Sequence, residues 1–510
     1  MIISLSVLVI TIIVSGTYAL YKAQLSKNIG VNTTTHGLAY YINYVKGTDI
    51  TAATLNPSTS YESGASSDIE FWKKDDSYDI YGKIELTVNT IGTNLSNSPA
   101  LKYAVVNNGN VLKEGSLKGT TSGSKVTILK NLYLEQTKQI YTVYVWLDNS
   151  EELGNISNES LSISVDCTAS LQKEPTAADT IISLYTSAAK VTATNNSITY
   201  NTAPSVSLMN DRLGGTTTDL DGGNIRYYGA NPNNYIYFNC SDYSNQTSST
   251  CETWRIIGVF DGKLKLIKGS QIGTYSWDNK NISTGAEDDR GKNDWTTARL
   301  MKLLNPDDYY INDNNDKDSE GNYLGYSLYY NSASGMCFTD EGVNYSACDF
   351  TSTGIKNDET RNMIAETTYN LGGWNDTGVY PNEIYEYERG TTVYTGRPTT
   401  WTGKIALAYP SDYGYAADLN QCKQTLANYD NSTCTSNNWM KAIITDNGSN
   451  HGWLLTPDSS YSYVAWYSQG NVGEYFTGAA RGAVPVLSLS SKLGIESGDG
   501  SSSNPYKLSA

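Results

Sequence analysis

Six of the seven cysteines fall into three close pairs, and this spacing constrains the fold more than any other feature of the chain. None of the spacings is the short C-x₂₋₄-C of zinc sites, and the chain has only two histidines. We therefore predict three disulfides between neighbours, each closing a loop of about a dozen residues and adding roughly 3 kcal/mol of stability. The predicted bridges are Cys240–Cys251, Cys337–Cys348 and Cys422–Cys434. Cys167 has no partner in this scheme. It is either a buried free thiol or one half of an intermolecular disulfide, and the sequence leaves both alternatives open.

The N-terminus carries an apolar run without a charged side chain from Ile2 to Tyr21. A run of this length serves as a membrane anchor or as a cleaved signal peptide. We assign residues 1–21 to such a segment, and the disulfides behind it indicate export to an oxidising compartment. No Lys or Arg precedes the run, so we expect the true start of the protein to lie upstream.

Composition narrows the class of partner. A net charge of −16 without a basic stripe excludes nucleic acid. The 41 tyrosines and 10 tryptophans, among many Asn, Ser, Thr and Gly residues, are typical of extracellular binding surfaces. A tyrosine-rich β-protein without any such surface would have the same composition.

Residues 22–170 show the alternation of β-strands. Apolar residues recur at every second position in 84–88, 141–147 and 161–165, and about seven strands accumulate. The segment predicts a β-sandwich. The SGTYA sequence at 15–19 and the YTVYVWLD sequence at 141–148 resemble the signal-anchored camelysin-type surface proteins of Gram-positive bacteria.

Residues 171–223 are expected to link two domains. Apolar positions in 176–190 predict a short amphipathic helix, and 195–223 is polar, Gly-rich and without periodicity.

Residues 224–510 predict a mixed α+β domain braced by the disulfides. Strands at 235–240 and 251–260 flank the first Cys pair, so that bridge should staple a hairpin. Helices are expected at 295–304 and 358–371, and strands return after residue 404. This order of elements along the chain, with strands before and after the helices, indicates an α+β domain rather than a doubly wound α/β sheet.

The last 60 or so residues carry a second resemblance. The WLLTP sequence at 453–457, Trp466, the turn at Gly470 and GAVPVL at 482–487 resemble bacterial C-type-lectin-like domains related in fold to the formylglycine-generating enzyme. This chain has Leu455 and Val484 where the pattern has arginines, so no role of those arginines is carried over. The resemblance implies a fold used for ligand display.

An acidic run offers one weak metal candidate. Asp316, Asp318 and Glu320 before Gly321 imitate the first half of a calcium loop, but Ser327 stands where the bidentate Glu belongs. A solvated acidic loop competes with this interpretation. We therefore predict no cofactor, with calcium as the alternative.

No catalytic constellation is recognisable. A triad would need His36 or His451, and His451 lies in a turn-like NGSNHGW sequence without a nucleophile elbow. We predict a non-enzymatic bacterial cell-surface protein that binds an extracellular glycan or protein and is attached to the membrane by its N-terminal segment. Two alternatives are a carbohydrate-active hydrolase with an unrecognised Asp/Glu pair and a matrix or filament subunit.

The predicted binding face lies in residues 459–475. Period-two alternation places Trp466 inward, together with Trp453, and Ala465 on the outer face with the tyrosines. The residues predicted to contact ligand are Tyr463, Tyr467, Gln469, Asn471, Glu474 and Tyr475. An ordinary tyrosine-rich surface strand would show the same pattern.

Overall fold

The structure, a computed structural model, describes residues 41–509 except 52–54, 56, 157–158, 172, 217–221, 280–289, 312–316, 318–324 and 338–344. The chain divides into two compact units with the boundary between Glu174 and Pro175. The predicted N-terminal anchor, residues 1–21, and the calcium candidates Asp316, Asp318 and Glu320 lie outside the described residues. Among the helices that are described, none has the length and apolarity to cross a membrane.

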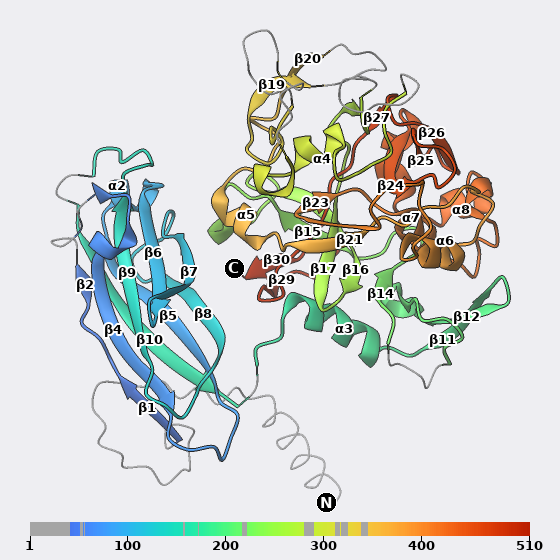
Figure 1. The fold of residues 1–510 in the computed structure, drawn as a ribbon. Helices are drawn as coiled ribbons and strands as arrows, with labels where there is room; N and C mark the ends of the chain where they lie inside the picture. Colours follow the sequence, from blue (N-terminus) through green and yellow to red (C-terminus); the bar gives the residue numbers. More distant parts are fainter. Residues whose placement is uncertain are drawn as a thin grey trace, which may run out of the picture. The chain divides into compact units, whose positions relative to one another are not determined.

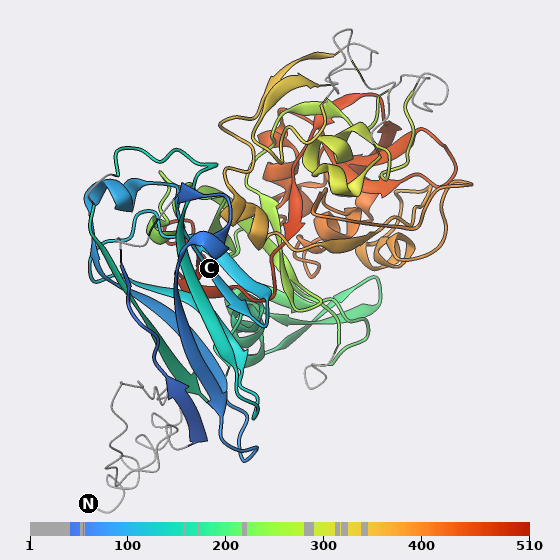
Figure 2. The same ribbon diagram turned by 60° about the vertical axis from the view of Figure 1, so that its left-hand side comes forward.

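The first unit is the predicted β-sandwich (Figure 1). One sheet has the order β1 (Ile42–Val45), β4 (Ala65–Lys73), β9 (Ile140–Asp148), β6 (Leu101–Asn107), β7 (Asn110–Ser116), with β3 (Pro57–Ser58) parallel to β9. The other has the order β2 (Ile50–Thr51), β10 (Leu161–Ser170), β5 (Tyr81–Ile91), β8 (Lys125–Tyr133), and a short helix α2 (Thr93–Asn97) follows β5. The strands lie side by side along the length of this unit in both views (Figure 2).

Alternate residues of both sheets meet in the sandwich core. Phe71 of β4, Leu86 of β5 and Val143 of β9 are fully buried there, as period-two patterning requires. Cys167 of β10 lies in the same core, and burial raises the pKa of its thiol well above the ordinary value. The spare cysteine is therefore a buried thiol in this structure.

The second unit contains a nine-stranded sheet. Its order is β11 (Val191–Asn195), β12 (Ile198–Ala203), β13 (Leu208–Asn210), β14 (Ile225–Tyr227), β16 (Glu252–Phe260), β17 (Lys263–Lys268), β28 (Val486–Ser488), β23 (Ile405–Ala406), and β15 (Tyr235–Phe238) pairs with β16.

The prediction of a linker over 171–223 is wrong for most of that segment. The strands β11, β12 and β13 belong to the nine-stranded sheet. The predicted helix is present as α3 (Ala177–Ser187), begun by a Thr176–Asp179 capping box, and it buries Ile181 and Tyr185 in the core of the second unit. These strands are short and are separated by polar, Gly-rich segments, so the sequence shows no regular alternation that would predict them.

A five-stranded sheet positions the candidate site. Its order is β18 (Thr274–Ser276), β27 (Ala480–Gly482), β24 (Gly452–Pro457), β25 (Val464–Ser468), β26 (Val472–Phe476), which makes β26 an edge strand (Figure 1). Three two-stranded pairs complete the strands: β19 (Ser334–Cys337) with β20 (Ser346–Asp349), β21 (Thr367–Asn370) with β22 (Thr400–Gly403), and β29 (Gly494–Ser497) with β30 (Lys507–Ser509). The helices are α4 (Arg299–Leu304), α5 (Asp358–Met363), α6 (Pro381–Glu388), α7 (Pro410–Tyr415), α8 (Ser432–Ser436) and α9 (Lys441–Ile444).

The helix predicted over 358–371 is half wrong. Asn357 caps α5, but the helix ends at Met363 and residues 367–370 form strand β21. The β-branched pair Thr367 and Thr368 favours the strand over a continued helix.

All three predicted disulfides are present. Cys240–Cys251 closes the β15–β16 hairpin, Cys337–Cys348 joins β19 to β20, and Cys422–Cys434 ties the chain after α7 to α8. The bridges close separations of 11, 11 and 12 residues. Each is a local brace, and the larger part of the fold depends on the buried core.

Candidate functional site

The central strand of the predicted binding face is buried from both sides. Ala465 of β25 packs with Trp453 and Leu455 in the main core of the second unit, whereas Trp466 packs with Leu454 in a separate cluster. Trp453 and Trp466 are thus both inward, but on opposite faces of the sheet. The prediction that Trp466 lies with Trp453 is wrong, as is the prediction of an outward Ala465, because both faces of β24 and β25 are covered.

A continuous series of aromatic rings nevertheless reaches solvent around β25 and the edge strand β26. Neighbouring ring centroids are 5.5 Å apart for His451–Tyr467, 6.3 Å for Tyr467–Tyr475, 5.0 Å for Tyr475–Phe476, 5.8 Å for Phe476–Tyr463 and 6.0 Å for Tyr463–Tyr461. We call these six residues the aromatic strip. Tyr461 is 55% exposed and Tyr475 38% exposed, so the strip offers ring faces and edges to a ligand.

Two arginines lie against this strip. The Arg481 guanidinium is 4.0 Å from the Tyr467 ring centroid and 4.3 Å from that of Tyr475, and its Nη1 donates to His451 Nδ1 at 2.6 Å. An accepting Nδ1 is that of a neutral imidazole, and partial burial together with the charge of Arg481 lowers the pKa of His451. Arg290 lies 4.5 Å from the Phe476 ring centroid and 4.9 Å from that of Tyr463.

The other predicted contact residues are divided by the structure. Gln469 is exposed in the turn between β25 and β26, where its N–H donates to the Asn471 carbonyl. The Asn471 amide donates to the Ala427 carbonyl at 3.3 Å, which holds it toward the neighbouring loop. Of the predicted residues, Tyr463, Tyr467 and Tyr475 are therefore brought together, with Gln469 and Asn471 at the turn beyond them.

Glu474 does not join this group. It lies opposite Trp466 in the β25–β26 register, and it is near enough to the buried carboxyl of Asp458 for the charge of that group to raise its pKa. Asp458 Oδ1 also accepts from the N–H groups of Ser460 at 2.5 Å and Tyr461 at 2.8 Å. These two donors favour the charged form of Asp458, so Glu474 is the carboxyl of the two that keeps its proton to higher pH. The prediction of Glu474 as an outward contact residue is wrong, because the β26 pleat turns it to the face of Trp466.

This carboxyl pair predicts a pH-dependent stability. Burial, then the charges of Asp458 and Asp376, raise the pKa of Glu474 to about 8, while the unfolded chain releases this proton near the ordinary value of 4.5. The folded protein then binds more protons than the unfolded chain between these values, so stability falls as pH rises from about 4.5 to 8. We expect Glu474→Gln to be neutral in thermal unfolding at pH 4 and to stabilise by roughly 2 kcal/mol at pH 8.5, a value reduced for partial exposure. An equal effect of the substitution at both pH values would contradict the raised pKa of Glu474.

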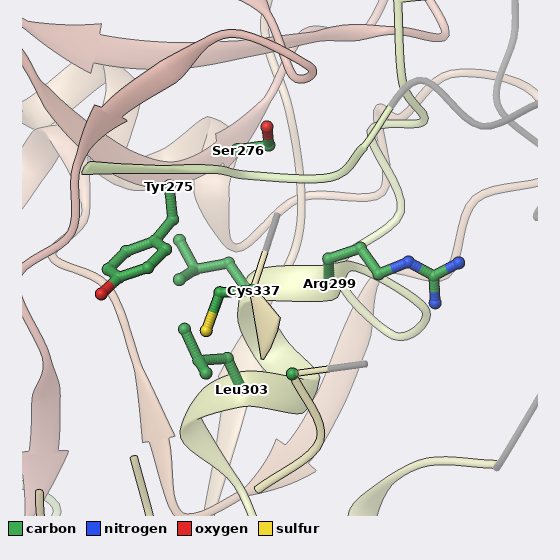
Figure 3. Close-up of a pocket in the computed structure, with 7 residues that line it drawn as sticks. Tyr275, Ser276, Arg299, Leu303 and Cys337 are labelled. Carbon is green, nitrogen blue, oxygen red and sulfur yellow. The ribbon is translucent and has the colours of Figure 1, made fainter. Parts of the chain in front are cut away.

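A pocket elsewhere in the second unit is too small to hold a ligand. Its lining residues are Tyr275, Ser276, Arg299, Leu300, Leu303, Gly325 and Cys337. Tyr275, Leu303 and Cys337 gather on one side, while the Arg299 side chain extends away (Figure 3). The volume of about 10 Å³ is that of about one water molecule. Among the described residues no cluster of His, Cys, Asp or Glu could hold a metal ion.

Sequence reasoning missed both arginines and Phe476. Arg481 directly precedes the GAVPVL segment and lies six residues after Tyr475 in the sequence. It could therefore have been noticed as a cation close to the tyrosines. Arg290 is 173 residues from Tyr463 in the sequence, so no local sequence pattern could have predicted their contact.

No family model and no curated protein matches the chain. Among solved structures, the receptor binding domain of botulinum neurotoxin mosaic serotype C/D is 12% identical, covers 52% of this chain and 75% of its own, and has a TM-score of 0.15. A single-residue mutant of HCR/D is 10% identical, covers 51% of this chain and 78% of its own, and has a TM-score of 0.16. At such TM-scores the likeness supports no inference about this chain.

Proposed function

We propose that the chain is an extracellular binding protein of a bacterial surface whose second unit binds a glycan on the aromatic strip. The observation that carries this proposal is the continuous series of rings, from His451 to Tyr461, flanked by two arginines. Aromatic faces stack on the C–H faces of sugar rings, and guanidinium groups supply directional donors beside them. The three disulfides support an oxidising compartment.

The size of the exposed strip favours a glycan over a protein partner. A stable protein interface buries on the order of 800 Å² on each side. Within the strip, Tyr461 and Tyr475 are more than a third exposed, while Tyr463, Tyr467 and Phe476 are half-buried. A narrow row of partly exposed rings matches a few sugar units better than a broad protein surface.

The hydrolase alternative receives no support from the Asp458–Glu474 pair. Glycosidases place two carboxyl groups on either side of the glycosidic bond, so both must be accessible to the substrate. Asp458 is fully buried, and the pair does not meet that requirement. This pair serves the fold of the β25–β26 hairpin.

A glycan array probed with the full chain tests the proposal. We expect binding to a restricted set of glycans, saturable and unchanged by calcium chelation. Absence of binding to every glycan, with the thermal transition intact, would overturn the proposed function. Capture of a protein ligand by the same strip, without glycan binding, would overturn it in favour of a protein partner.

A further inference from the structure

Arg290 is held firmly beside the strip by its backbone. Its carbonyl accepts from the Gly478 N–H at 2.8 Å and from Thr477 Oγ1 at 3.2 Å, just beyond the end of β26. The side chain lies on Phe476 and Tyr463, and Nη1 donates to the Tyr463 hydroxyl at 3.0 Å. The guanidinium plane is thus fixed on two rings at the exposed end of the strip.

The charge of Arg290 is not balanced by a carboxylate among the residues that the structure describes. By contrast, Arg361 has Asp358 at 2.7 Å and Arg226 has Asp211 at 2.6 Å. An exposed guanidinium stacked on aromatic rings keeps most of its N–H donors for an outside acceptor, and its planar fork matches a carboxylate.

We propose that Arg290 is the specificity residue for a carboxylate on the bound glycan, so that the ligand is an acidic saccharide. This inference rests on the proposed function and names the ligand class. In a chain of net charge −16, long-range attraction does not draw in an anionic ligand. Recognition then depends on the local fork of Arg290, with the sugar ring stacked on Tyr463 and Tyr461.

The test uses the full chain and carboxylated oligosaccharides, such as hyaluronan and oligogalacturonate fragments, each beside its carboxyl-reduced neutral counterpart. We expect at least one carboxylated member to bind 10-fold or more tightly than its reduced partner. Arg290→Gln should abolish that preference, and Arg290→Lys should restore part of it, because lysine keeps the charge but loses the fork. Arg212→Gln, at another exposed arginine of the same unit, should leave the preference unchanged.

The outcomes separate the two claims. Equal binding of acidic and neutral partners, or a preference that survives Arg290→Gln, overturns the role of Arg290 and leaves glycan binding standing. Binding to neutral glycans alone has the same consequence. Binding to neither class, with a normal thermal transition, overturns both the acidic ligand and the proposed function.

Discussion

Asp412→Ala should destabilise the second unit by about 3–5 kcal/mol, because it removes the shared anion of a buried ionic network. Arg226 Nη1 donates to Asp412 Oδ1 at 2.9 Å, and Lys265 Nζ pairs with Asp412 Oδ2. All three side chains are buried. Burial alone would raise the pKa of Asp412, but the charges of Lys265 and Arg226 outweigh it and hold the pKa below its ordinary value. Without this carboxylate, Arg226 keeps its ion pair with Asp211, whereas buried Lys265 loses the carboxylate with which it pairs.

Urea unfolding of the second unit measures this effect, and the surface pair Asp358–Arg361 gives a matched control. Asp358 is largely exposed, so Asp358→Ala removes an ion pair of similar length and should change stability by less than about 1 kcal/mol. A loss below about 1 kcal/mol for Asp412→Ala, equal to that of the control, would show that the network is not needed to hold α7 against β14 and β17.

The largest expected effect on binding comes from the double substitution Tyr461→Ala and Tyr475→Ala. These are the two exposed tyrosines of the strip, and each truncation of a central aromatic contact costs about 2 kcal/mol. If the two losses add, the affinity for a glycan ligand should therefore fall roughly 1,000-fold. Both side chains are exposed, so the free energy of unfolding should change by less than about 1 kcal/mol.

Tyr78→Ala is the control for this pair. Tyr78 is 44% exposed and belongs to the first unit, whereas the aromatic strip belongs to the second. Its removal should leave glycan affinity unchanged. Calorimetric titration with a glycan from the array, together with thermal unfolding, decides the matter. Full affinity in the double variant would remove the strip from consideration.

Local features of the chain were predictable, because they need no knowledge of distant partners. The three disulfides follow from spacing, and the stapled hairpin follows from two strand patterns around one Cys pair. The buried strands of the sandwich follow from alternation in segments such as 141–147 and 161–165. In each case the deciding contacts lie within a few residues or within one periodic segment.

Features that depend on distant contacts were not predictable. Alternation in 461–467 correctly separates Tyr467 from Trp466, but it cannot reveal that a second cluster covers the other face of the sheet. Glu474 shows the same limit, because Asp458, whose charge acts on it, lies 16 residues away in the sequence. The strands β11 to β13 were missed since their polar residues pair within a large sheet. Arg290 reaches Tyr463 only through the fold.

Hydroxyl-radical footprinting of the full chain, with and without a glycan ligand, tests the central claim most directly, because it reports the solvent exposure of individual tyrosines. The aromatic strip as a binding site predicts that oxidation of Tyr461, Tyr463 and Tyr475 falls several-fold in the complex. Oxidation of Tyr78 and Tyr133 in the sandwich should stay constant. Unchanged oxidation of the strip in a saturated complex, with protection at tyrosines elsewhere, would contradict the account.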